Sequence, residues 1–186
     1  SITSDDLGNT SEADTVEGLL HYPLDFDPDA DERHPLIIML HGGPSDADQD
    51  RFLESWGGSP GLFAARGAFV LRPNYHGSSG YGLEWLESIK GRYYELEVTD
   101  ILAGVDALLG QGHVDASRLG IQGWSNGAIL GIATCLESGE RFRALDAGAG
   151  DVNWSSDFGN CAFGAGFGRA YFGGAPWDLP QAYLDK

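Results

Sequence analysis

The sequence is short of lysine, cysteine and long apolar runs, and each shortage excludes a class of protein. Lysine occurs only at Lys90 and Lys186, and 11 basic residues stand against 28 acidic ones, for a formal net charge of −17. A surface of this sign repels nucleic acid and anionic membranes. No apolar run approaches the ~20 residues of a membrane-spanning helix. The composition therefore predicts neither a nucleic-acid-binding nor a membrane-spanning protein.

Metal sites and export signals are also poorly supported. Cys135 and Cys161 are too few and too far apart for a disulfide framework or a zinc site. Residues 25–32 carry aspartate at alternate positions like a calcium loop, but Ala30 replaces the required glycine and Leu36 the terminal glutamate, so we expect a solvated turn. Residues 1–6 lack the features of a signal peptide, which leaves a soluble cytoplasmic protein, or one exported after signal removal, as open locations.

The most informative absence is that of a histidine after the serine motif at 123–127. Gly123-Trp124-Ser125-Asn126-Gly127 matches Gly-x-Ser-x-Gly, in which a serine on a sharp strand-to-helix turn acts as a nucleophile. In α/β-hydrolases the acid and then the histidine follow that serine. All the histidines of this sequence precede it: His21, His34, His41, His76 and His113. The chain thus has a candidate nucleophile, Ser125, and no histidine where its base is expected.

Alternating apolar patterns predict an α/β domain with a mostly parallel sheet. Residues 36–40 form a continuous apolar run typical of a buried strand, and residues 95–109 carry apolar side chains at helical spacing. Further strands are expected at 15–22, 68–71, 119–122 and 142–147, and further helices near 62–65 and at 128–137. Beyond residue 148 we expect an ordered irregular segment anchored by aromatic side chains. Residues 1–14 are expected to form a flexible arm on a single domain spanning 1–186.

A second glycine-rich motif, His41-Gly42-Gly43-Pro44, follows the run at 36–40. Glycines let the backbone approach a substrate oxygen closely, and α/β-hydrolases take one oxyanion N–H from such a loop and one from the residue after the nucleophile. We expect these donors to be Gly43, with Gly42 as the next candidate, and Asn126. His76 is the best candidate within the chain for a surrogate base, and His41 is better interpreted as a structural loop residue.

Four motifs in order carry a resemblance to a known family. They are His41-Gly42-Gly43-Pro44, the sequence Arg-Pro-Asn-Tyr-His-Gly-Ser-Ser-Gly-Tyr-Gly at 72–82, the helix at 100–109, and residues 114–121 leading into the serine motif. Over residues 15–150 the sequence resembles the catalytic domain of the prolyl oligopeptidase family, especially its acylaminoacyl-peptidase and dipeptidyl-peptidase-like branch. The resemblance implies a three-layer α/β-hydrolase domain, incomplete at its C-terminal end, with Ser125 as nucleophile and Gly43 and Asn126 as oxyanion donors.

The sequence departs from the family pattern in three respects. Asn126 stands where such proteins often carry tyrosine, the β-propeller that usually precedes the domain is absent, and the acid and histidine would lie on later loops. Asp146 and Asp151 follow Ser125, but with no later histidine to orient, neither is assigned a catalytic role. The aromatic residues Tyr75, Trp124, Trp154 and those of 158–172 are more typical of a core than of a substrate pocket.

Three functional hypotheses follow. The first is a serine hydrolase that cleaves peptide or small ester bonds through an acyl-enzyme on Ser125, which requires no cofactor or metal. The second is a catalytically incomplete fragment, and the third a non-catalytic association module that keeps the fold. A sheet that ends near Ala144 exposes an edge, so we expect self-association or pairing with a missing C-terminal segment.

The acidic composition also suggests adaptation to high salt, which unfolding experiments test. Salt shortens the screening length from about 10 Å at 0.1 M to about 3 Å at 1 M and so weakens repulsion among carboxylates. We expect the free energy of unfolding, measured by urea titration, to rise with KCl concentration over this range. Full stability at low salt would contradict this interpretation.

Overall fold

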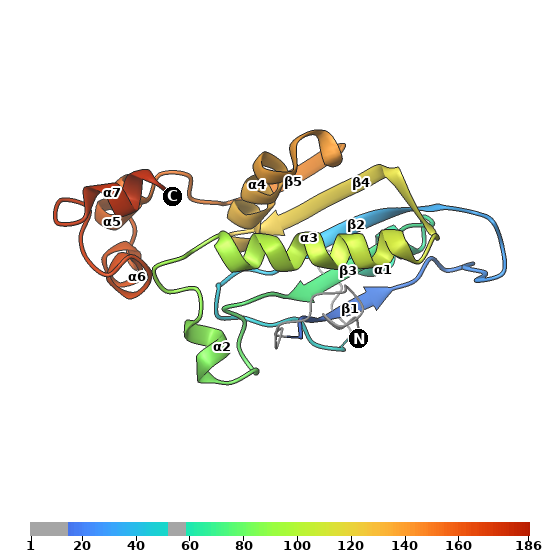
Figure 1. Ribbon diagram of the computed structural model, residues 1–186, viewed down its shortest axis with the longest axis horizontal. Helices are drawn as coiled ribbons and strands as arrows, with labels where there is room; N and C mark the ends of the chain where they lie inside the picture. The colour runs from blue at the N-terminus through green and yellow to red at the C-terminus, as the bar shows by residue number, and fades with distance from the viewer. Residues whose placement is uncertain (1–14, 52–58) are drawn as a thin grey trace.

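The computed structural model describes residues 15–51 and 59–186 and shows a five-stranded sheet with helices packed against it (Figure 1). The strands are β1 (Glu17–His21), β2 (His34–Leu40), β3 (Phe69–Asn74), β4 (Val114–Trp124) and β5 (Ala144–Gly148). Their order is β1-β3-β2-β4-β5, and only β1 runs antiparallel to its neighbour. The predicted α/β class with a mostly parallel sheet is confirmed.

The described residues form seven α-helices, of which three pack on the faces of the sheet and the others lie away from them (Figure 1). The helices are α1 (Pro60–Ala64), α2 (Leu83–Glu87), α3 (Glu95–Gly110), α4 (Asn126–Ser138) with a 3₁₀ turn at Gly139–Arg141, α5 (Trp154–Asn160), α6 (Gly164–Tyr171) and α7 (Pro180–Leu184). Connections between parallel strands are right-handed. The connection from β2 to β3 crosses the sheet toward β1, whereas those from β3 to β4 and from β4 to β5 cross it in the opposite direction. Helix α1 therefore lies on one face of the sheet, and α3 and α4 on the other.

The main core lies between the sheet and the layer of α3 and α4. Leu36, Ile38 and Leu40 of β2 are buried together with apolar residues of β3, β4 and α3. The alternate residues of β2, Ile37 and Met39, are only partly buried, so burial on both faces, expected from the apolar run, is incomplete. Strand β4 is also longer than predicted, because it begins at Val114, which pairs with His34.

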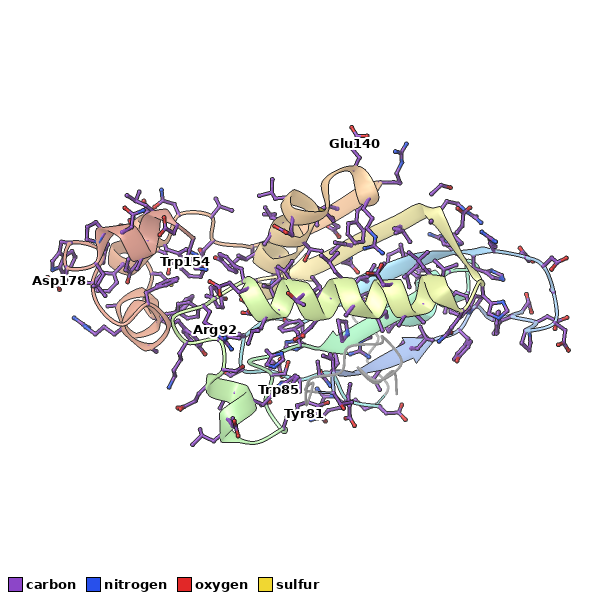
Figure 2. All side chains as sticks on the ribbon, viewed as in Figure 1. Tyr81, Trp85, Arg92, Glu140, Trp154 and Asp178 are labelled. Atoms are coloured by element: carbon purple, nitrogen blue, oxygen red, sulfur yellow. The ribbon has the colours of Figure 1, made fainter. Side chains whose placement is uncertain are left out.

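The expectation of an irregular segment after residue 148 is wrong, because α5, α6 and α7 occupy it. Asn153 caps α5 by accepting a hydrogen bond from the backbone N–H of Ser156. These helices enclose a second core around the residues that precede α3, and Figure 2 places Trp154 and Arg92 where the two segments meet. The buried members of that core are Ile89, Tyr93, Ile129, Trp154, Phe158, Phe172, Ala175 and Tyr183.

Most of the aromatic residues expected in the core are found there. Tyr75, Trp154, Phe158 and Phe172 are buried, and Phe167 and Tyr171 pack partly buried against the second core, but Phe163 is 56% exposed. Trp124 also differs: it is 53% exposed, and its ring covers the backbone of Gly148, where an added Cβ would lie only 2.4 Å from a ring carbon. None of the helices among the described residues has the length and apolarity to cross a membrane.

Helix α4 begins in direct backbone contact with the ends of β2 and β4. A Cβ on Gly127 would lie 2.1 Å from the carbonyl oxygen of Leu40, and a Cβ on Gly123 would lie 2.1 Å from that of Gly127. Backbone atoms have no rotamers through which to move away, so the first turn of α4 fits its place only because these residues are glycine.

Substituting Gly127 tests that packing. We expect Gly127→Ala to lower the free energy of unfolding by about 3 kcal/mol or more, because overpacking against backbone cannot relax through side chains. Gly166→Ala in α6 is the matched control, since nothing lies within 4 Å of its added Cβ and alanine favours a helix by about 1 kcal/mol. Equal urea midpoints for Gly127→Ala and wild type would contradict the close approach.

Glu97, in the first turn of α3, is a fully buried carboxyl group. Neither of its oxygens has a hydrogen-bond partner among the described residues. Burial raises its pKa from 4.5 to about 7, although the nearby backbone N–H groups of Glu97 and Tyr94 partly oppose the shift. The folded protein therefore holds this proton more tightly than the unfolded chain does.

This raised pKa predicts a stability that falls with pH. The loss begins near the unfolded pKa of 4.5 and is complete above about 7, where it amounts to about 3 kcal/mol, since one pKa unit corresponds to about 1.4 kcal/mol. Glu97→Gln removes the ionisation, so it should be more stable than wild type at pH 8 and lose that advantage at pH 4. Glu95→Gln, on the exposed side of the same turn, is the control. A wild-type advantage over Glu97→Gln at pH 8 would contradict the prediction.

Candidate functional site

The carboxyl ends of β2, β3 and β4 meet at one edge of the sheet, because the three strands are parallel neighbours. His41 follows β2, Tyr75 and His76 follow β3, and Ser125 follows β4. In α/β folds this edge is where ligands bind. The candidate residues predicted from separate motifs thus belong to one end of the sheet.

Ser125 occupies a strained turn between β4 and α4. Its backbone has φ 55° and ψ −121°, a left-handed conformation that is uncommon for a residue with a side chain. The turn is fixed by hydrogen bonds from the N–H of Ser125 to the carbonyl of Gly148, and from the N–H of Ala128 to the carbonyl of Ser125, each 2.9 Å long. The side chain is partly exposed, and its hydroxyl makes no hydrogen bond among the described residues.

The two predicted oxyanion segments come together around this serine. A Cβ on Gly42 would lie 3.5 Å from Ser125 Cβ and 4.0 Å from its Oγ, so the loop after β2 touches the elbow. Gly43 has φ +119° and would bring a Cβ within 2.5 Å of the Ser45 nitrogen, so this turn requires glycine. Asn126 is the first residue of α4, where backbone N–H groups have no partner within the helix.

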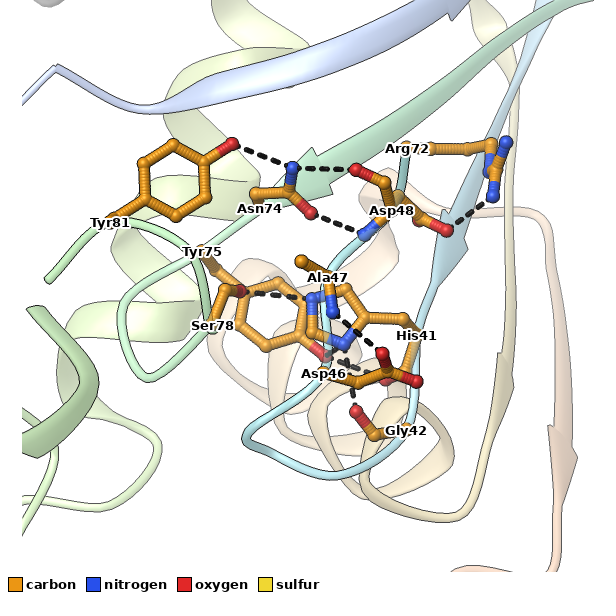
Figure 3. Close-up of polar contacts among 10 residues, drawn as sticks. All are labelled: His41, Gly42, Asp46, Ala47, Asp48, Arg72, Asn74, Tyr75, Ser78 and Tyr81. Atoms are coloured by element: carbon orange, nitrogen blue, oxygen red, sulfur yellow. Dashed lines mark hydrogen bonds and ion pairs between the residues drawn. The ribbon is translucent and has the colours of Figure 1, made fainter. Parts of the chain in front are cut away.

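His41 is held inside the loop that it begins (Figure 3). Its Nδ1 lies 2.8 Å from the carbonyl oxygen of Gly42, and its Nε2 lies 2.9 Å from Ser78 Oγ. The ring stacks on Tyr75 with 4.3 Å between centroids. Burial lowers its pKa, partly offset by the Gly42 carbonyl and the charges of Asp48 and Asp46. A neutral ring with the proton on Nδ1 satisfies both contacts, since a carbonyl only accepts.

The same loop is fastened to β3 by a polar clamp that sequence reasoning missed. The amide of Asn74 accepts from the N–H of Asp48 at 2.7 Å and donates to the Asp48 carbonyl at 3.0 Å and to the hydroxyl of Tyr81 at 2.8 Å. Arg72 forms a buried ion pair with the Asp48 carboxylate. Arg72, Asn74 and Tyr81 all belong to the motif at 72–82, but nothing in the sequence indicated Asp48 as their partner.

His76 lies further along the same edge and is paired with an acid. Its Nδ1 is 2.7 Å from Asp100 Oδ2, its backbone N–H donates to the same oxygen at 2.8 Å, and its ring stacks on Trp85 at 3.7 Å. A carboxylate on Nδ1 is the arrangement that orients a catalytic histidine. However, β2 separates β3 from β4, and no contact between either candidate imidazole and Ser125 is found in the described part of the chain.

Two buried tyrosine hydroxyls adjoin the elbow. Tyr75 donates to the carbonyl oxygen of His41 at 2.6 Å, and Tyr93 donates to Oδ1 of Asn126. Burial raises the pKa of both phenols well above 10, so both remain protonated donors at physiological pH. The Asn126 side chain is only 2% exposed and therefore faces the interior rather than the substrate side. Within residues 15–51 and 59–186, no three acidic, histidine or cysteine side chains are grouped to hold a metal ion.

The chain is similar in sequence to known peptidases. Over 178 residues the chain is 28% identical to dipeptidyl-peptidase 5 of Porphyromonas endodontalis, covering 96% of this chain and 25% of that protein. It is 30% identical over 139 residues to the human acylamino-acid-releasing enzyme, covering 72% of this chain and 18% of that enzyme. The chain thus spans about a quarter or less of the length of these curated relatives.

Solved structures show the same fold. A puromycin-hydrolyzing peptidase of Mycobacterium tuberculosis superposes with a TM-score of 0.80 at 25% identity, over 92% of this chain and 26% of that one. An acylaminoacyl peptidase of Pyrococcus horikoshii superposes with a TM-score of 0.78 at 23% identity, over 91% and 27%. Residues 56–185, more than two thirds of the chain, match the Prolyl oligopeptidase family itself. The chain therefore belongs to the prolyl oligopeptidase family.

Proposed function

We propose that this chain supplies the nucleophile and the oxyanion donors of a serine peptidase of the prolyl oligopeptidase type. The observation that carries the proposal is the strained backbone of Ser125, which places its hydroxyl beside Gly42 at the start of α4. Membership of the family supports peptide or ester bonds as substrates. The active assembly would cleave them through an acyl-enzyme on Ser125.

The geometry suits the negative charge of that reaction. Attack by Ser125 Oγ on a carbonyl carbon places charge on the carbonyl oxygen, which requires backbone donors that are already in position. We assign these donors to Gly43 and Asn126, with Gly42 as the alternative in the first position. The N-terminal end of α4, a 13-residue helix, adds a favourable dipole at the same place.

The proton acceptor for Ser125 is proposed to come from outside these residues. Serine without a base is a poor nucleophile. Both ring nitrogens of His41 are bonded, to Gly42 and Ser78, and His76 follows β3, which β2 separates from the strand that leads into Ser125. Neither is a base in this proposal.

Strand β5 offers a place for the missing acid and histidine to join. It is the last strand of the described sheet, so its outer edge has backbone groups that seek a partner. Leu136, Leu145 and Val152, on and beside this edge, are 80%, 38% and 76% exposed. We propose that a further C-terminal segment carrying the acid and the histidine pairs here, and a second copy of the chain is the alternative occupant.

The same exposed edge favours one competing function. If the proton acceptor is never supplied, the domain keeps the fold for association alone. The biological function of the assembled protein would then be unchanged by Ser125→Ala, which separates this hypothesis from the catalytic one.

Ester hydrolysis by the 186-residue chain tests the proposal. Without a base in the chain, we expect hydrolysis of a short p-nitrophenyl ester no more than about 10³–10⁴-fold above water, which is the level that the oxyanion hole and binding supply alone. His41→Gln and His76→Gln, checked for folding by circular dichroism, should leave this rate within a few-fold, and a phosphonate should label Ser125 covalently in wild type but not in Ser125→Ala. Absence of that labelling in the folded chain would contradict the proposal, whereas faster, Ser125-dependent turnover that is lost in His76→Gln would place the base within the chain.

A further inference from the structure

We propose that the side chain of Asn126 ties the two halves of the oxyanion hole together, through Tyr75 to the loop after β2 and through Tyr93 to the segment before α3. This role is a positioning one and differs from that of the Asn126 backbone N–H, which is the expected donor to substrate. The inference rests on the proposed function, because it concerns the donors of that site.

The Asn126 amide lies between the two phenols. Its Oδ1 accepts the hydrogen bond of Tyr93, while its Nδ2 is buried and has no partner at hydrogen-bond distance among the described residues. The amide nevertheless lies close enough to Tyr75 to oppose, in part, the rise of that phenol's pKa. A buried donor left unpaired costs about 1–3 kcal/mol, so Nδ2 gains by donating to Tyr75 Oη.

Tyr75 has the free capacity to accept that bond. Its one proton is committed to the carbonyl oxygen of His41 at 2.6 Å, and one of its two lone pairs faces His41 Nδ1 at 3.2 Å, which leaves the other lone pair to accept. The resulting chain runs from Tyr93 to Asn126, from Asn126 to Tyr75, and from Tyr75 to the His41 carbonyl. Each hydrogen bond in this chain runs in one defined direction, from donor to acceptor.

The end of this chain determines where the loop N–H groups point. The His41 carbonyl belongs to the same planar peptide unit as the Gly42 N–H, so a bond to the first orients the second. The His41 ring, stacked on Tyr75, reaches the Gly42 carbonyl through Nδ1, and that peptide unit carries the Gly43 N–H. Tyr75 thus supports both candidate donors of the loop.

Between Tyr93 and Tyr75 of this chain, an amide has the groups that both phenols need. It offers an acceptor to Tyr93 and a donor to Tyr75, whereas leucine of similar size offers neither and an ionised aspartate offers no donor. All substitutions except proline keep the Asn126 backbone N–H. If a substitution of Asn126 alters the positions of the Gly42 and Gly43 N–H groups, the cause is therefore the loss of the Asn126 side chain.

Amide NMR of the 15N-labelled 186-residue chain tests the tie without any need for catalysis. We expect Asn126→Leu and Tyr75→Phe each to shift the Gly42 and Gly43 amide signals, and the double variant to shift them no further, because the two residues act in one chain. Thr134→Val, a buried polar change in the same helix, is the control and should leave those signals in place. Unmoved Gly42 and Gly43 signals in folded Asn126→Leu would overturn the proposal.

Kinetics provide a second readout that a purely structural role would not move. In ester hydrolysis by the chain, Asn126→Leu and Tyr75→Phe should lower kcat by roughly 10²-fold, as loss of an oxyanion donor does, with KM nearly unchanged. Asn126→Asp should retain activity at low pH, where the protonated acid can still donate, and lose it as the pH rises. A raised KM with unchanged kcat would overturn the tie. Moved Gly42 and Gly43 signals in a chain whose Ser125 is not labelled by a phosphonate would uphold the tie and count against the proposed function alone.

Discussion

The approach of backbone to backbone where β2, β4 and α4 meet is the constraint on which the site depends. Gly127 lies against the carbonyl of Leu40, Gly123 lies against Gly127, and Gly42 lies against Ser125. A side chain at Gly127 would push α4 away from the end of β2, and one at Gly123 would open the elbow itself. The strained φ of Ser125 persists because packing on both sides fixes the turn, in which its N–H is also bonded to Gly148.

Glycine permits this approach but does not fix the orientation of the peptide groups, so neighbouring polar side chains must do so. The loop after β2 is held by three separate devices: the clamp of Asp48 by Arg72 and Asn74, the ring of His41, and the hydroxyl of Tyr75. All are buried or partly buried, where hydrogen bonds are stronger than in water. The acidic surface that dominates the composition thus coexists with a loop held by one buried ion pair and by neutral donors and acceptors.

The sequence predicted those parts of the molecule that local pattern controls. Apolar periodicity located β2, α3 and the strand before the elbow, and motif spacing identified Ser125 and the glycine loop. The prediction from sequence failed after residue 148, because frequent glycine suggested irregular structure. Phe163, Phe167 and Tyr171 nevertheless recur at helical spacing, and the helices there are stabilised by packing around Trp154. The pairs His76–Asp100 and Tyr93–Asn126, 24 and 33 residues apart, depend on how the elements pack and leave no local signal.

This dependence on packing explains why the proposed oxyanion hole needs residues that never touch substrate. Its donors come from two chain segments, the loop after β2 and the start of α4, that share no covalent constraint and meet only through glycine. A substrate oxygen senses the relative placement of the two N–H groups, and small displacements reduce stabilisation of the transition state. Buried tyrosines are suited to this task, because each has a rigid ring, two side-chain torsions and a single directed proton. The precision of the site therefore resides as much in Tyr75 and Tyr93 as in the motif residues that the sequence displays.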